Sequence, residues 1–318
     1  MADWFSIILI ILGLSLFEII ISIDNAVINA EVLSTMSKKG RKWFLFWGII
    51  TAVFLVRGIL PWMIVWASNP SLGFLGAFTA SFSSDPHIKE IVEKSAPILL
   101  IGGGTFLVFL FFHWIFLEPK NYGLTGEEFI HKKGIWFFAV VSVLLSVIVW
   151  LAIKANPLMA FGAVIGSTAF FITHGFKENA EQAEKNMLKG SSKLSDLSKI
   201  FYLEIIDATF SIDGILGAFA FTFMLPVILI GNGLGALVVR QITVMNIDNV
   251  KKYKYLKNGA MYSIFALGVV MILHSFGAHI PEWISPALTF GIIGYFFYKS
   301  HKELKNKKAK NGKIRKSY

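Results

Sequence analysis

Two clusters of acidic and polar residues interrupt stretches of the sequence that are otherwise apolar. Their members are Glu18, Ser22, Asp24 and Asn25 in the first cluster and Glu204, Asp207, Ser211 and Asp213 in the second. The tetrapeptides at 22–25 (SIDN) and 211–214 (SIDG) nearly repeat each other, and their alignment places Glu18 opposite Asp207. Ionised carboxylates are expensive inside a bilayer, so we interpret both clusters as functional.

The residue types in these clusters favour binding of a cation. Carboxylate, hydroxyl, amide and carbonyl oxygens suit hard or borderline divalent ions such as Mn²⁺, Mg²⁺ and Ca²⁺, whereas Zn²⁺ and Cu⁺ usually recruit cysteine, histidine or methionine. The five carboxylates together exceed the charge of one ion. Charge compensation is expected from Arg57 and Arg240, or from protons that some carboxylates exchange for the ion. The second alternative leads to proton antiport.

The composition places the chain in the membrane class. Of its 318 residues, 55% are hydrophobic and 15% aromatic, and the mean hydropathy is +0.64, which is more apolar surface than one soluble domain can cover. The absence of cysteine excludes disulfides, thiolate metal ligands and a cysteine nucleophile. The net charge of +10 resides in short loops and a C-terminal tail, a pattern of membrane topology and not of nucleic-acid binding.

Apolar runs of roughly 20 residues, the length that crosses a bilayer, predict an all-α polytopic membrane protein with about nine transmembrane helices. The predicted spans are 4–30, 43–66, 96–117, 134–153, 157–173, 199–222, 224–243, 259–277 and 283–298. They form one transmembrane transporter domain at 1–298. A basic cytoplasmic tail follows at 299–318, which we expect to be disordered and to face anionic lipid headgroups.

Lysine and arginine are concentrated in the connections after the first, third, fifth and seventh spans. The positive-inside rule therefore places the N-terminus outside and the C-terminus in the cytoplasm, in a multi-pass protein of the cell (inner or plasma) membrane. The first and sixth spans then run in opposite directions. Residues 1–117 and 199–277 are predicted to form an inverted-topology repeat, with the spans of 134–173 between the halves.

Helical spacing indicates how each cluster is arranged. Glu18, Ser22 and Asn25 form a stripe on one face of their predicted helix. Glu204, Asp207 and Ser211 form a stripe on one face of a second predicted helix. We expect these stripes to face each other. Asp24 and Asp213 each follow an aligned carboxylate by six residues, which is roughly 120° around a regular helix. We therefore expect the helix to open near Asp24 and near Asp213, where Asn25 and Gly214 tolerate a break.

Simpler interpretations stay open for single residues. Glu204 taken alone is equally explained as the structural partner of an arginine, and Arg240 can extend its charge to the interface. Ser22 and Ser211 can donate to a backbone carbonyl instead of binding a ligand. Two histidines at 113 and 274 lie near span ends, where interfacial placement is favoured over metal ligation.

Other function classes fit the sequence less well. An intramembrane aspartyl protease also places aspartates on two membrane helices, but its Gly-x-Gly-Asp and Tyr-Asp contexts are absent, so we expect no enzyme and no cofactor. A membrane stress-response scaffold with a structural ion needs more docking surface than the short loops offer. An exporter of a small organic cation or solute is the nearest alternative. The expected partners are the bilayer and a divalent metal ion, and a homo-oligomer is compatible with the sequence.

The two acidic motifs resemble those of the TerC family of integral membrane proteins. The matching segments are E-x-x-x-S-x-D-N-A at 18–26, E-x-x-D-x-x-x-S-x-D at 204–213, YLKNGAMYSIFALGVVMIL at 255–273 and HIP at 279–281. The resemblance spans most of the chain and implies a metal-ion exporter, with manganese the best-supported substrate class, and an association with tellurite resistance. By the same resemblance, the ion-binding residues would be Glu18, Asp24, Asn25, Glu204, Asp207 and Asp213.

The second motif departs from the TerC pattern. That pattern continues with an acid, a serine and soon a proline, whereas Asp213 is followed by Gly214, Ile215 and Leu216. Ser211 also stands where alanine is usual. The chain therefore resembles a divergent branch grouped with TerC.

Overall fold

The structure is a computed structural model that describes residues 4–48, 50–51, 57–68, 70–80, 86–189, 195–245 and 252–314. None of these described residues lies in a β-strand, so the predicted all-α fold is confirmed for them. Within the described residues, six helices are long and apolar enough to cross a membrane. They are Trp4–Ile21, Lys94–Leu117, Gly134–Ala155, Pro157–Asn179, Leu225–Ile242 and Leu256–Ser275. The chain is therefore a multi-pass membrane protein.

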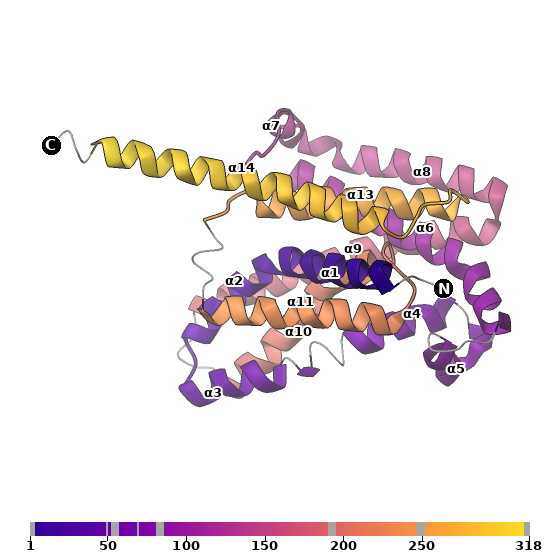
Figure 1. Cartoon of the computed structure of the whole chain (residues 1–318), viewed down its shortest axis with the longest axis horizontal. Coiled ribbons are helices and arrows are strands. Elements are labelled where there is room, and N and C mark those ends of the chain that lie inside the picture. Colours follow the sequence, from indigo (N-terminus) through magenta and orange to yellow (C-terminus); the bar gives the residue numbers. More distant parts are fainter. Residues whose placement is uncertain are drawn as a thin grey trace.

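The long helices run side by side along the molecule, and α14 projects beyond the rest of the chain at its C-terminal end (Figure 1). They are α1 (Trp4–Ile21), α2 (Ile23–Ser34), α6 (Pro86–Leu117), α8 (Phe137–Ala155), α9 (Pro157–Lys189), α10 (Asp196–Ala218), α11 (Leu225–Met245), α13 (Leu256–Ser275) and α14 (Ile284–Ile314). The shorter helices are α3 (Lys38–Trp43), α4 (Leu60–Ser68), α5 (Gly73–Ala80) and α7 (Glu127–His131), with a π-helical turn at Phe44–Gly48 and 3₁₀ turns at Pro70–Leu72 and Gly134–Trp136.

Helix α6 lies at the centre of the packing. It contacts α13 on one side and α9 on the other, and α9 in turn packs against α8. Helix α14 lies between α13 and α1, and α1 packs along α11. The largest buried side chains in the core between these helices are aromatic and include Phe17, Phe106, Trp114 and Phe170, all almost fully buried. Burial of such large side chains is the main source of packing energy in the bundle.

Two glycines let α6 and α13 approach closely. A Cβ atom at Gly104 would lie 2.8 Å from the carbonyl oxygen of Gly268. A Cβ atom at Gly268 would lie 3.1 Å from the carbonyl oxygen of Gly104. Each glycine therefore makes room for the backbone of the other, which is how small residues pack membrane helices.

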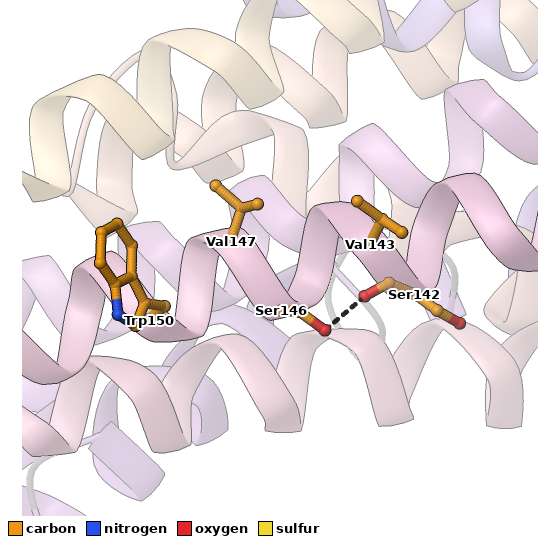
Figure 2. Close-up of a pocket in the computed structure, with 5 residues that line it drawn as sticks. All are labelled: Ser142, Val143, Ser146, Val147 and Trp150. Carbon is orange, nitrogen blue, oxygen red and sulfur yellow. Dashed lines mark hydrogen bonds between the residues drawn. The ribbon is translucent and has the colours of Figure 1, made fainter.

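The outer face of α8 shows the surface that the bundle presents to lipid. Ser142, Val143, Ser146, Val147 and Trp150 line a shallow groove along this one helix (Figure 2). The Ser146 hydroxyl donates to the Ser142 carbonyl at 2.8 Å, so its polar group is satisfied within the helix. A largely apolar exposed face with internally satisfied hydroxyls is typical of a helix that faces hydrocarbon.

The structure differs between the two places where a helix opening is predicted, near Asp24 and near Asp213. An interruption lies at Ser22, between α1 and α2, two residues before Asp24. The hydrogen bonds from Ser22 N to Glu18 O and from Ala26 N to Ser22 O, at 3.1 and 2.9 Å, continue the helical course across it. The opening predicted near Asp213 is wrong, because α10 is continuous from Asp196 to Ala218. Gly214 serves close packing there, since a Cβ atom on it would lie 2.8 Å from Glu18 Oε2.

The prediction of a disordered tail is wrong for residues 299–314, which continue α14 as a helix. Contacts with the segment before α13 hold the start of this region. The Ser300 hydroxyl accepts a hydrogen bond from Tyr255 N at 3.0 Å, and Glu303 forms an ion pair with Lys254 at 2.5 Å. A lysine-rich sequence with good helix formers therefore extends an apolar helix instead of ending it.

Candidate functional site

A buried arginine joins the two acidic helices. Arg57 Nη2 lies 2.5 Å from Glu18 Oε1 of α1, and Nη1 lies 3.8 Å from Asp207 Oδ2 of α10. The exposed fractions of Arg57, Glu18 and Asp207 are only 3%, 1% and 8%. The two carboxylates that the repeat aligns thus meet through one guanidinium. A buried ion bridge of this kind is strongly favoured over any of its charges standing alone.

Glu18 is positioned where three helices meet. A Cβ atom at Gly235 of α11 would lie 2.6 Å from Glu18 Cβ, and one at Gly214 of α10 would lie 2.8 Å from Glu18 Oε2. The Ser22 hydroxyl, one turn further along, donates to Glu18 Oε1 at 2.8 Å. Glycines on both neighbouring helices therefore make the space for this carboxylate, and a serine orients it.

The two aligned serines have different partners. Ser22 donates to the Glu18 carboxylate, whereas the Ser211 hydroxyl donates to the Asp207 backbone carbonyl at 2.6 Å. Donation to a carbonyl four residues earlier is a common use of serine inside a helix. In this arrangement only Ser22 directs its hydroxyl to an acidic side chain.

Glu204 pairs with the second arginine. Arg240 Nη2 lies 3.0 Å from Glu204 Oε1 and donates to the Phe44 carbonyl at 3.3 Å. The guanidinium also lies 4.0 Å from the centre of the Phe44 ring, a cation–π distance. Arg240 is 9% exposed, so its charge is held inside the protein by these contacts. Glu204 is thus the partner of an arginine, which is one of the interpretations that the sequence left open for this residue.

Asp213 faces a different neighbour. Its Oδ2 lies 3.7 Å from Lys177 Nζ of α9. Because Asp213 follows Asp207 by six residues on a continuous helix, the two carboxylates point about 120° apart. The structure therefore divides the predicted site into the Arg57-bridged pair and a separate contact between α10 and α9. Asp24 and Asn25 belong to α2, and their side chains lie outside the described residues.

A ready-made metal cage is absent from the part of the chain that the structure describes. No group of three or more His, Asp or Glu side chains there is arranged to hold a metal ion. The carboxylates at Glu18, Asp207 and Glu204 are instead occupied by arginine nitrogens. A cation that binds these carboxylates would therefore share them with a guanidinium or replace it.

A second buried carboxylate site was missed from the sequence. Glu127, at the start of α7, is 2% exposed and accepts hydrogen bonds from Gly123 N, Leu124 N, Asn258 Nδ2 and Tyr262 OH at 2.6–3.0 Å. The only local signal is an acid at a helix start after two glycines. The donors on α13 lie more than 130 residues away, so spacing could not reveal them.

A third carboxylate, Glu118, follows the end of α6. Its two oxygens lie 3.4 Å from His113 Nδ1 and 3.0 Å from Lys257 Nζ. Burial alone would raise the pKa of Glu118, but His113 and the positive charges of Lys257 and Lys177 outweigh burial and lower this pKa well below its usual range. Glu118 is therefore a charged anchor between α6 and α13.

A family model matches most of the chain. The family described as "Protein of unknown function (DUF475)" matches residues 23–308, which is most of the chain. No curated protein and no solved structure matches the chain. The matched range includes Asp24, Arg57, all the acidic residues of α10 and Arg240.

Proposed function

The chain belongs to the DUF475 family, and we propose that it is a transporter that exports a divalent metal cation, with Mn²⁺ the preferred cargo. One observation carries this proposal: a single buried cation, Arg57, lies between the carboxylates of two acidic helices. The guanidinium stands where a metal ion would neutralise the same two acids. We propose that the ion enters by displacing Arg57 from one carboxylate.

The charge balance favours a divalent cargo. The acids counted are the five carboxylates of the two clusters, and the cations that offset them are Arg57, Arg240 and Lys177, the partner of Asp213. Five negative and three positive charges leave a net charge of −2, which one divalent ion neutralises. An organic cation with one charge would leave an uncompensated carboxylate, which is costly in the membrane. The resemblance to TerC supports manganese in particular.

The proposed transport cycle uses an inverted repeat. The reciprocal contact between Gly104 and Gly268 supports it, because equivalent helices of two inverted halves meet reciprocally at their symmetry axis. We propose about nine spans, with 43–66, α10 and the first part of α14 added to the six apolar helices. With the N-terminus outside, one half would rock against the other within the cell membrane. This movement would carry the metal out of the cytoplasm.

The test is uptake of metal into proteoliposomes that contain the purified protein. We compare Mn²⁺ with Ca²⁺, Mg²⁺ and Zn²⁺ in the wild type and in Glu18→Gln, which keeps the size of the side chain and removes its charge. Glu128→Gln is the matched control, because Glu128 is an exposed acid that pairs with Lys132.

We expect wild-type Mn²⁺ uptake to fall at least a hundredfold in Glu18→Gln and to be unchanged in Glu128→Gln. Near-normal uptake by Glu18→Gln would overturn the assignment of the site. If no cation is moved by the wild type but one binds tightly, transport is overturned and a membrane scaffold with a structural ion takes its place.

A further inference from the structure

Two histidines meet at the contact between α6 and α9. The ring centroids of His113 and His174 lie 3.8 Å apart with an interplanar angle of 55°. Phe170 stacks on His174 at 5.7 Å, and Phe137 presents its edge to His113 at 5.5 Å. His113 is 7% exposed. The imidazole pair therefore lies among aromatic rings at the contact between α6 and α9.

A carboxylate lies at each end of the histidine pair. His113 Nδ1 is 3.4 Å from Glu118 Oε1, and His174 Nε2 is 3.4 Å from Glu178 Oε1. The Glu178 side chain is 72% exposed, whereas that of Glu118 is 24% exposed. The four groups thus lead from solvent through two imidazoles to a partly buried acid. Proton relays in membrane proteins are built from chains of such groups.

The charged groups around the pair come from three helices and the residue after α6. Glu118 follows α6, Lys177 and Glu178 lie on α9, Lys257 lies on α13, and Asp213 lies on α10. Lys177 acts electrostatically on Glu118 and contacts Asp213. The charge on the pair therefore acts through Glu118 and Lys177 on α10, the helix that carries Asp207.

Imidazoles at this distance repel each other when both are protonated, so the pair holds one proton more readily than two. Imidazole is also the side chain that gains and loses a proton near neutral pH. We propose that His113 and His174 form a proton-exchange site that binds one proton and releases it during transport, which makes the proton the coupling ion. This inference rests on the proposed transport function. One proton binds to the imidazole pair through His174 and one proton is released from the pair. One N–H bond forms, one N–H bond breaks, and no other bond changes.

The first experiment measures protons moved per Mn²⁺ ion in proteoliposomes, with a lumenal pH dye and metal uptake recorded together. We expect His113→Gln and His174→Gln to reduce metal-linked proton movement at least tenfold, while Mn²⁺ affinity in detergent stays within twofold. His279→Gln, an exposed histidine, is the matched control and should leave the ratio unchanged. An unchanged proton-to-metal ratio in both variants would overturn the proposal.

A second experiment separates this inference from the transport proposal. The titration of ¹⁵N-histidine-labelled wild-type protein is followed by NMR without metal. We expect the signals of both rings to respond together to protonation, because each imidazole senses the charge on the other at 3.8 Å. Glu178→Gln, a change at an exposed side chain, should shift this shared response. Signals of His113 and His174 that change independently of each other would overturn the site even if metal transport is found.

Discussion

Two carboxylates in this protein are almost equally buried, yet their surroundings differ. Glu127 is 2% exposed and accepts four hydrogen bonds from neutral donors of the loop before α7 and of α13. Glu18 is 1% exposed and is held by one hydroxyl and by the guanidinium of Arg57. The first carboxylate is fixed by groups that cannot leave without unfolding the loop. The second is held mainly by one long side chain that also reaches Asp207.

Burial alone therefore does not separate a carboxylate that can accept a ligand from one that cannot. A carboxylate that is saturated by fixed neutral donors has no capacity left for a ligand, so Glu127 ties the loop to α13. A carboxylate that shares one cation with a second acid keeps a charge that another cation can satisfy. The nature of the partner, and not the depth of burial, distinguishes the two sites.

The largest expected effect is on stability at the first site. Glu127→Ala leaves four buried donors without an acceptor, so we expect the free energy of unfolding to fall by about 3–5 kcal/mol. Thermal and denaturant unfolding of the detergent-solubilised protein measures this loss. The neighbouring exposed acid provides the control, and Glu128→Ala should leave the midpoint of unfolding unchanged. A small loss in Glu127→Ala would contradict this role, since the four donors would then not depend on the Glu127 carboxylate.

A smaller effect is expected at the second site. Arg57→Gln removes the cation that competes with the metal, so we expect Mn²⁺ to bind at least about tenfold more tightly, which is about 1.4 kcal/mol. Turnover should fall because a tightly held ion leaves slowly. Isothermal titration calorimetry measures the affinity and proteoliposome uptake measures the turnover. Weaker Mn²⁺ binding in Arg57→Gln would mean that the arginine supports the ion site instead of occupying it.

The smallest effect concerns pH at Glu118, whose carboxylate has charged partners but remains partly exposed. Its pKa in the folded protein lies below the ordinary value of 4.5, so its stabilising contribution is complete above about pH 4.5 and is lost as the pH falls through the folded value. Because solvent screens the group, we expect a contribution of about 1 kcal/mol. When the pH is lowered from 6 to 3, the free energy of unfolding should therefore fall more in the wild type than in Glu118→Gln. Equal losses in the two proteins would contradict this role.

The sequence predicted part of the site for clear physical reasons. Carboxylates and arginines in apolar helices need one another, so their presence in successive spans predicted that Arg57 and Arg240 would compensate the acids, and the structure pairs both with acidic residues. Helical spacing also placed Asp213 on another side of α10 from Asp207. The expected opening near Asp213 failed because a glycine has two uses, and Gly214 makes room for Glu18 rather than breaking the helix.

Other features depend on contacts that spacing along the chain does not encode. Glu127 receives donors from Asn258 and Tyr262, which lie in another part of the sequence. The histidine pair joins α6 to α9, and only the packing of these helices brings His113 and His174 together. The order of residues 299–314 likewise depends on contacts with the segment before α13. Such long-range pairings become visible only when the helices are placed in space.

We propose that the carboxylates joined by Arg57 form the cation site. The most direct measurement is Mn²⁺ binding to the purified protein by electron paramagnetic resonance, in wild type and in Asp207→Asn. We predict saturable binding of one Mn²⁺ per chain in the wild type and at least a hundredfold weaker binding in Asp207→Asn, with Glu128→Gln as the unaffected control. Equal Mn²⁺ affinity in wild type and Asp207→Asn would contradict the account.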